Sequence, residues 1–305
     1  MRIGLINELT GRPNGPRPAP TWASISERAR TAENVGFDMF VFEDALLFRG
    51  ETATSGAWES VSIAAALAAT TETMHLGQSV VNAPYRSPAL MAKIAETLDE
   101  ISGGRYVLGI GAGNTADSDY EAFGFPTDRR FSRFAEAVEI IATLLRTGKA
   151  DFTGEFYSAR DAELVLRGPR PHGPPINIAG RGPKMLRLAA RHADAWNWWG
   201  YDETLDEIRE RIGPTLAALD DACRDEGRDP ETLERTFDLY TVVPEGFSPE
   251  GAEVTKPIAG SSAEIAAYIL GLADLGFGEV RCNVYPYTVD AVAAMQPIVE
   301  LVHAS

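Results

Sequence analysis

Short apolar segments alternate with segments of helical periodicity eight times along this 305-residue chain. The apolar segments are four to seven residues long, and several are apolar throughout, which is typical of parallel strands that helices cover on both faces. A closed (β/α)8 barrel needs eight such units and commonly takes about 250 residues. The alternation therefore predicts an α/β fold, a (β/α)8 TIM barrel, with a doubly wound open sheet as the alternative. The predicted strands are residues 3–6, 39–42, 76–81, 106–110, 176–179, 193–198, 237–243 and 279–284.

The alternation is interrupted once, before the fifth predicted strand. Residues 149–175 are polar and rich in Gly and Pro, and they contain a predicted hairpin around 151–157. We therefore expect a single domain over residues 1–305 with an insertion at about 149–175. The predicted helices are residues 21–35, 58–70, 88–101, 134–145, 183–193, 205–219, 265–272 and 289–302.

The residues that follow the predicted strands are polar, small or aromatic. In a barrel of this kind, chemistry takes place at the carboxyl ends of the strands, so these residues are expected to meet at one face. Their composition is typical of a ligand cleft. They are Asn7, Glu8, Glu43, Asp44, Asn82, Gly111 to Asn114, Gly180 to Gly182, Asn197, Trp198, Pro244, Glu245 and Tyr285.

A candidate phosphate site lies within residues 174–197, where a strand, a tight turn and a helix follow one another. The turn Gly180-Arg181-Gly182-Pro183 has glycines that permit unusual backbone angles and a proline suited to the first helical position. The helix's N-terminal amides and the nearby Arg181 and Lys184 favour an anion such as a phosphate. The alternative is an ordinary strand-to-helix connection, because any tight turn uses Gly and Pro.

The composition limits the kinds of molecule that the protein is expected to bind. Apolar content of 45% and charged content of 24% are those of a soluble globular protein. A formal charge of −16 argues against nucleic acid and anionic membranes as partners. No segment approaches the ~18 apolar residues of a membrane span, and no secretory signal follows Met1, so a cytoplasmic location is expected. Two cysteines and four scattered histidines match no metal-ligand spacing, and no metal site is predicted.

Three motifs together resemble the bacterial-luciferase-like flavin- and F420-dependent oxidoreductases. They are SGGRYVLGIGAG at residues 102–113, DYEAFGFPTDRRFSRFAEAVEII at 119–141, and PPINIAGRGPKMLRLAARHADAWN at 174–197. The order and spacing of the three motifs match those of the family, and the resemblance covers most of the chain. It implies a (β/α)8 barrel with an insertion before the fifth strand, which binds a reduced flavin or deazaflavin at the carboxyl ends of its strands.

The resemblance also implies which residues contact the cofactor. The segment Ala179 to Pro183 matches the phosphate-binding loop, and Gly111, Ala112 and Gly113 match the glycine-rich segment beside the ring. Arg130 lies where family side chains approach the cofactor phosphate. Glu43 and Asp44 lie where many members place a polar residue against the ring; a histidine is common there, so the acidic pair is a departure. Asp44 is the candidate catalytic residue.

One further segment bears on which cofactor is used. Ser79, Val80, Val81 and Asn82 resemble the place where F420-using members carry a bulge with a non-prolyl cis peptide behind the ring. Against F420, Asn114 follows Gly113 where some F420 enzymes have an acidic proton donor. FMN and F420 therefore both stay open as cofactors.

Three functions follow as alternatives. The leading hypothesis is a monooxygenase that uses reduced FMN and O2 on a small organic substrate, with a separate flavin reductase as a possible partner. Its rival is an F420-dependent hydride-transfer oxidoreductase without O2. The third is a non-catalytic flavin-binding barrel. Family resemblance also implies a homodimer.

Overall fold

The computed structural model describes residues 1–11, 19–49, 53–113, 118–200, 203–252 and 256–305. Eight parallel strands form a closed barrel in which each strand pairs with the next along the chain, β14 pairs with β1, and β7 pairs with β10. The barrel predicted from the alternation is confirmed. Its strands are β1 (Arg2–Asn7), β2 (Met39–Phe42), β5 (His75–Gln78), β7 (Tyr106–Gly111), β10 (Ile176–Ala179), β11 (Ala195–Gly200), β12 (Glu234–Val243) and β14 (Glu279–Val284).

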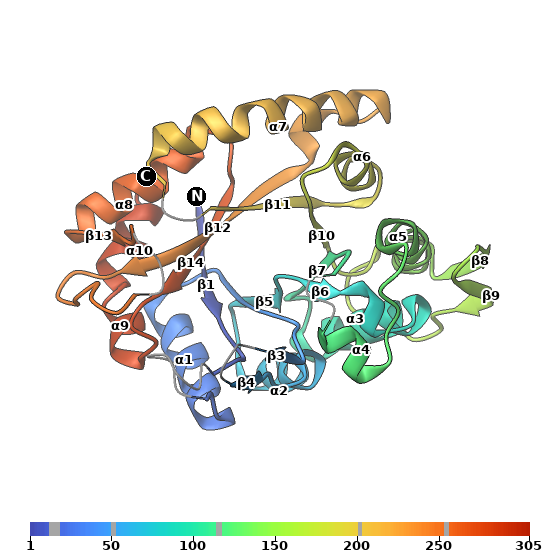
Figure 1. Ribbon diagram of the computed structural model, residues 1–305, viewed down its shortest axis with the longest axis horizontal. Coiled ribbons are helices and arrows are strands. Elements are labelled where there is room, and N and C mark those ends of the chain that lie inside the picture. The colour runs from blue at the N-terminus through green and yellow to red at the C-terminus, as the bar shows by residue number, and fades with distance from the viewer. Residues whose placement is uncertain (12–18, 50–52, 114–117, 201–202, 253–255) are drawn as a thin grey trace.

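Helices surround the barrel and cover its outer face (Figure 1). Three of them begin with a capping box, in which the side chains of Thr21, Thr204 and Ser261 accept a hydrogen bond from the backbone three residues on. These caps satisfy amides that have no partner within the helix. The covering helices are α1 (Trp22–Val35), α2 (Ser60–Thr70), α3 (Pro88–Ser102), α5 (Arg130–Thr147), α6 (Pro183–His192), α7 (Leu205–Asp225), α8 (Ser262–Ala273), α9 (Val289–Ala293) and α10 (Gln296–His303).

Two predicted elements differ from the structure. The final helix, predicted as one over 289–302, is divided into α9 and α10, because Pro297 lacks an amide hydrogen and fits the start of a helix better than its interior. The third strand, predicted over 76–81, ends at Gln78 and resumes as β6 (Val81–Asn82). The peptide between Ser79 and Val80 separates the two pieces and is cis.

The insertion before the fifth barrel strand is present. It is a hairpin of β8 (Lys149–Thr153) and β9 (Ser158–Glu163) that projects beyond α5 (Figure 1). The hairpin predicted around 151–157 is confirmed, although its strands extend further than predicted in both directions. The remaining short elements are β3 (Leu47–Arg49), β4 (Thr54–Gly56), η1 (Ala83–Tyr85), α4 (Ser118–Phe123), η2 (Pro230–Thr232) and β13 (Ile258–Ala259).

The inside of the barrel is polar as well as apolar. Arg281 is 3% exposed and contacts the carboxylate of Glu279, which also accepts a hydrogen bond of 3.0 Å from Arg2 Nε. Burial alone would raise the pKa of Glu279, but Arg281 and Arg2 hold it below the usual value. Buried charges thus occur as pairs beneath the carboxyl-terminal face, as their desolvation cost requires.

Candidate active site

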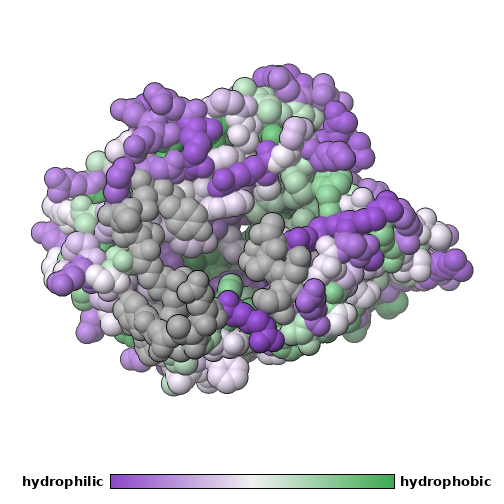
Figure 2. Space-filling view, viewed as in Figure 1, coloured by the Kyte–Doolittle hydropathy of each residue, from purple (hydrophilic) through white to green (hydrophobic). Residues whose placement is uncertain are grey.

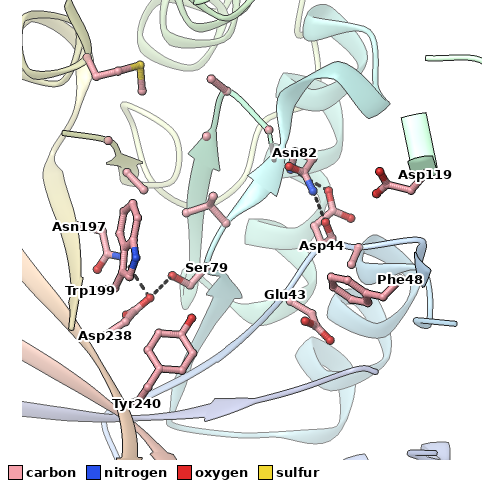
Figure 3. Close-up of a pocket in the computed structure, with 18 residues that line it drawn as sticks. Glu43, Asp44, Phe48, Ser79, Asn82, Asp119, Asn197, Trp199, Asp238 and Tyr240 are labelled. Atoms are coloured by element: carbon pink, nitrogen blue, oxygen red, sulfur yellow. Dashed lines mark hydrogen bonds between the residues drawn. The ribbon is translucent and has the colours of Figure 1, made fainter. Parts of the chain in front are cut away.

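A cavity of about 480 Å³ lies at the carboxyl ends of the barrel strands. Its wall is built by residues at or just after the ends of β2, β5, β7, β10, β11 and β12, and this face of the molecule is hollowed near its centre (Figure 2). Figure 3 shows Asp238 and Ser79 on one side of the cavity and Asp44 and Asn82 on the other. The lining residues are Glu43, Asp44, Ala45, Phe48, Ser79, Val80, Asn82, Gly111, Ala112, Gly113, Asp119, Ala179, Gly180, Met185, Asn197, Trp199, Asp238 and Tyr240.

Most of the residues predicted to hold the cofactor line this one cavity. The others are not part of its lining: Val81 is fully buried in β6, Arg130 begins α5, and the residues from Arg181 to Pro183 form an exposed turn. The assignment of all of them to a cofactor stays a prediction. The predicted residues that do line the cavity are Glu43, Asp44, Ser79, Val80, Asn82, Gly111, Ala112, Gly113, Ala179 and Gly180.

Asp44 is fixed in the cavity wall by four hydrogen bonds to its carboxylate. Arg86 Nη1 and Nη2 donate at 2.7 and 3.0 Å, Ser60 Oγ donates at 2.7 Å, and the Asn82 amide donates at 2.9 Å. The Asp44 side chain is fully buried, and that of Arg86 is 11% exposed. A carboxylate with these partners joins the ends of β2 and β6, and it has little capacity left for a reacting group.

The neighbouring Glu43 holds the first barrel loop in place. Its carboxylate accepts a hydrogen bond of 3.0 Å from the Leu9 amide and another from the Thr10 hydroxyl. These bonds join the end of β2 to the residues after β1. Both acidic residues predicted at the ring therefore contribute to the cavity wall through contacts with protein groups.

The glycines after β7 are required by close packing within the wall. A Cβ at Gly111 would lie 2.7 Å from Val80 Cγ2, and one at Gly113 would lie 2.0 Å from Tyr120 Oη. Gly113 also has φ +94°, which side chains other than glycine rarely adopt. Glycine at these two positions lets the 79–82 segment and the Tyr120 ring lie against the end of β7.

The predicted phosphate turn leads from β10 into α6. Gly182 is the residue before the helix, Pro183 is its first residue, and no side chain in the described part of the chain caps the helix. The Arg181 guanidinium stacks 3.8 Å from the Trp199 ring centroid and donates to the Trp199 carbonyl at 3.1 Å. A cation is therefore held beside an aromatic wall of the cavity and next to a helix N-terminus.

Asp238 is a carboxyl group that the sequence prediction missed. Its Oδ2 accepts hydrogen bonds from Ser79 Oγ at 2.7 Å and Asn197 Nδ2 at 3.0 Å. Its Oδ1 has no hydrogen-bond partner in the part of the chain that the structure describes; Arg281 Nη1 is 3.6 Å away. Complete burial raises the pKa of Asp238, although Arg281 and the hydrogen bonds from Ser79 and Asn197 act in the opposite direction.

The other lining residues that the sequence prediction missed lie on barrel strands or on elements that follow them. Those on strands were missed because an apolar run does not show which of its residues face the inside of the barrel. An acidic residue within such a run, like the Asp in FDLYTVV, is nevertheless a signal of function. Asn197 and Trp199 face the cavity from β11, whereas Trp196 and Trp198 are buried. The lining residues that were not among the predicted cofactor contacts are Ala45, Phe48, Asp119, Met185, Asn197, Trp199, Asp238 and Tyr240, of which Asn197 was expected at this face as a strand-end residue.

The cavity fits a flat heteroaromatic ring. Its volume is within the range of about 300–1,000 Å³ typical of ligand pockets. Val80, Met185 and Trp199 supply apolar surface, and Ser79 and Asn82 supply polar groups for the edges of a ring. Among the described residues, no group of three or more His, Cys, Asp or Glu side chains is placed to hold a metal ion. No described helix is long and apolar enough to cross a membrane.

Sequence comparison places the chain among known enzymes. The luciferase-like monooxygenase family matches residues 1–253, which is most of the chain. The chain belongs to this family. The resemblance found in the three motifs is thereby confirmed, and the named relatives of this luciferase-like protein are reductases, dehydrogenases and monooxygenases.

The curated relatives include reductases, dehydrogenases and monooxygenases. The 5,10-methylenetetrahydromethanopterin reductase of Archaeoglobus fulgidus is 43% identical over 128 residues, covering 42% of this chain and 37% of the relative. The F420-dependent glucose-6-phosphate dehydrogenase of Kineococcus radiotolerans is 33% identical over 57% and 50% of the two chains. The pyrimidine monooxygenase RutA of Bradyrhizobium sp. is 34% identical over 59% and 51%. The luciferase-like chain thus spans only about a third to a half of these relatives.

Solved structures of the same fold extend over the full luciferase-like chain. An F420-dependent secondary alcohol dehydrogenase superposes with a TM-score of 0.80 at 17% identity, over 99% of this chain and 98% of the other. The monooxygenase RslO1 from Streptomyces bottropensis superposes with a TM-score of 0.79 at 22% identity over both full chains. At these identities the likeness establishes the barrel fold.

Proposed function

We propose that this protein reduces or oxidises a small organic molecule by hydride transfer, with the deazaflavin F420 in the cavity. The observation that carries the proposal is the buried Asp238 carboxyl at the cavity wall. A hydride added to a carbon leaves a neighbouring oxygen or nitrogen that needs a proton, and a carboxyl with a raised pKa retains one at a pH where an exposed aspartate is ionised. Similarity to the F420-dependent dehydrogenase supports the choice of cofactor.

The residues around Asp238 are arranged to hold and direct that proton. Ser79 and Asn197 fix Oδ2 through bonds of 2.7 and 3.0 Å, so the carboxyl cannot rotate freely. Arg281, 3.6 Å from Oδ1, limits how far the pKa rises and stabilises the carboxylate that remains once the proton has been transferred, until solvent reprotonates it. F420, when bound in reduced form, supplies the hydride.

Asp44 has a different role in this proposal. Its four hydrogen bonds make it a positioning residue for Asn82 and the cavity wall, so the catalytic assignment moves from Asp44 to Asp238. The turn from Gly180 to Pro183, with Arg181 beside it, is proposed to hold the cofactor phosphate at the start of α6.

The reduced-FMN monooxygenase is the second candidate. Similarity to the pyrimidine monooxygenase RutA over 191 residues favours it. In that reading the same turn holds the FMN phosphate, and a separate flavin reductase supplies the reduced cofactor. A homodimer stays a prediction in either reading.

Two measurements test the proposal. Fluorescence titration with F420 and with FMN should show saturable binding of F420 only. Anaerobic oxidation of reduced F420 by a panel of ketones, imines and enones should then proceed without O2. Binding of FMN alone, with O2 consumption during turnover, would establish the monooxygenase instead.

A variant at Asp238 tests the proton donor. Asp238→Asn keeps the size of the side chain but cannot donate a carboxyl proton, so kcat for reduction should fall about 100-fold while F420 binding stays unchanged. Because burial raises its pKa, the protein's reduction rate should decline as pH rises through that pKa, and the variant should lack this decline. An unchanged kcat with the same pH profile contradicts the assignment.

A further inference from the structure

A second hollow, the α5–α6 groove, adjoins the cavity across the turn from Gly180 to Pro183. It has a volume of about 310 Å³ and lies between α5 and α6, which pack side by side (Figure 1). Gly180 and Met185 face the cavity, whereas Pro183 and Lys184 face the groove. A molecule held at this turn can therefore extend from one hollow into the other. The groove is lined by Phe131, Ala135, Pro183, Lys184, Arg187, Leu188 and Arg191.

The groove is basic in an acidic protein. Helix α6 carries Lys184, Arg187, Arg191 and His192 and has no acidic residue, although the whole chain has a net charge of −16. The acidic residues of α5 nearest this region are occupied. Glu136 accepts hydrogen bonds from three backbone amides of the hairpin turn, and Glu139 lies 3.1 Å from His192. The positive charge of the groove is therefore only partly neutralised from α5.

Two of the three groove cations are held loosely. The Lys184 ammonium is exposed, lies 5.4 Å from the Phe131 ring centroid, and has no carboxylate within 4.0 Å among the described residues. Arg187 is 3.9 and 4.0 Å from Glu226 and Asp225, longer than hydrogen bonds. Arg191, in contrast, is bound by Glu226 at 2.8 and 3.0 Å.

We propose that the α5–α6 groove binds a chain of carboxylates that continues beyond the cofactor phosphate, as in the glutamate tail of F420, with Lys184 and Arg187 as its cationic contacts. This inference rests on the proposed use of F420. The apolar floor of Phe131, Ala135 and Leu188 accommodates the methylene groups between successive carboxylates. FMN ends at its phosphate and has no group to occupy the groove.

The proposal is tested with two forms of the cofactor, one with a glutamate tail and one that ends at the phosphate. Fluorescence titration of the full chain at low ionic strength should give about three- to tenfold tighter binding of the tailed form, the gain expected of two exposed ion pairs. Added salt should reduce this preference. The double variant Lys184→Gln/Arg187→Gln should lose this preference, so that the ratio of its affinities for the two forms falls to about one.

The matched control removes two exposed arginines from α7. Arg209→Gln/Arg224→Gln lowers the net charge by the same amount at sites where each arginine has an acidic partner three residues away, and it should keep the tail preference. Equal affinity of the parent for the two forms overturns the groove assignment and leaves F420 use intact. If the groove variant weakens the binding of both forms equally, the groove assignment is also overturned, because that result would mean that the two cations contact the phosphate. Binding of neither form overturns the F420 proposal together with the groove.

Discussion

Asp44 offers the sharpest test of how the cavity wall is held together. In Asp44→Asn the carboxylate becomes a neutral amide of the same shape, and Arg86, whose side chain is 11% exposed, loses its two-bond partner. Breaking a buried ion pair by removing one partner costs about 3–5 kcal/mol. Glu59, which is 45% exposed, still contacts Arg86, so the lower end of this range applies. We expect the free energy of unfolding to fall by about 3 kcal/mol.

Denaturant unfolding followed by circular dichroism measures this loss directly. Asp206→Asn is a suitable control, because Asp206 is 88% exposed and its pair with Arg209 should contribute less than about 1 kcal/mol. Cofactor affinity should also fall in Asp44→Asn, since an amide has one acceptor oxygen where the carboxylate has two, and the Asn82 amide then competes with Arg86 and Ser60 for it. Stability within about 1 kcal/mol of the parent, combined with a lost limb in the pH–rate profile, would refute the positioning role and restore Asp44 as an acid–base group.

Two further predictions concern the phosphate turn and the acid limit of stability. Gly182→Val should weaken cofactor binding about tenfold in an affinity titration, because its side chain would occupy space at the proposed phosphate site. The protein should stay folded, because a Cβ at this position meets no atom within 4 Å. Unchanged affinity would argue against a phosphate at this turn. Burial raises the pKa of Glu33, but hydrogen bonds from the amides of Met74, Thr73 and Glu72 bring it below 4.5. Stability from these bonds is therefore present above the unfolded pKa and lost as pH falls through the folded pKa, and Glu33→Gln should show a shallower loss of melting temperature below about pH 4.5. An identical slope in the variant would argue against the contribution of Glu33.

The strand and helix pattern could be predicted because burial leaves a local trace. A strand covered on both faces is apolar throughout, and the apolar residues of the helix that follows recur every three or four positions. A few consecutive residues were therefore enough to predict β2, β10 and the helices after them. The break between β5 and β6 left no trace in the periodicity, and only the family resemblance of Ser79 to Asn82 indicated an irregular segment there. Its pairing with β7, Val81 beside Ile110 and Asn82 beside Gly111, depends on a strand distant in the sequence.

The candidate site was partly predictable for the same reason. Strand ends converge at one face of any (β/α)8 barrel, so Asp44, Asn82 and Gly113 could be grouped without coordinates. What each does could not be predicted. The partners of Asp44 come from 16 and 42 residues further along the chain, and those partners are the reason that we propose a positioning role for it in place of the predicted catalytic one.

The sequence by itself determined the barrel, the family and the edge at which the cavity lies, because periodicity and motif spacing are properties of contiguous residues. Only the tertiary structure decided that Asp238, unlike Asp44, has a carboxyl oxygen without a hydrogen-bond partner among the described residues, and that cations of α6 line a groove beside the cavity. Hydrogen-bond saturation and desolvation depend on which distant side chains meet. These quantities exist only once the barrel has closed.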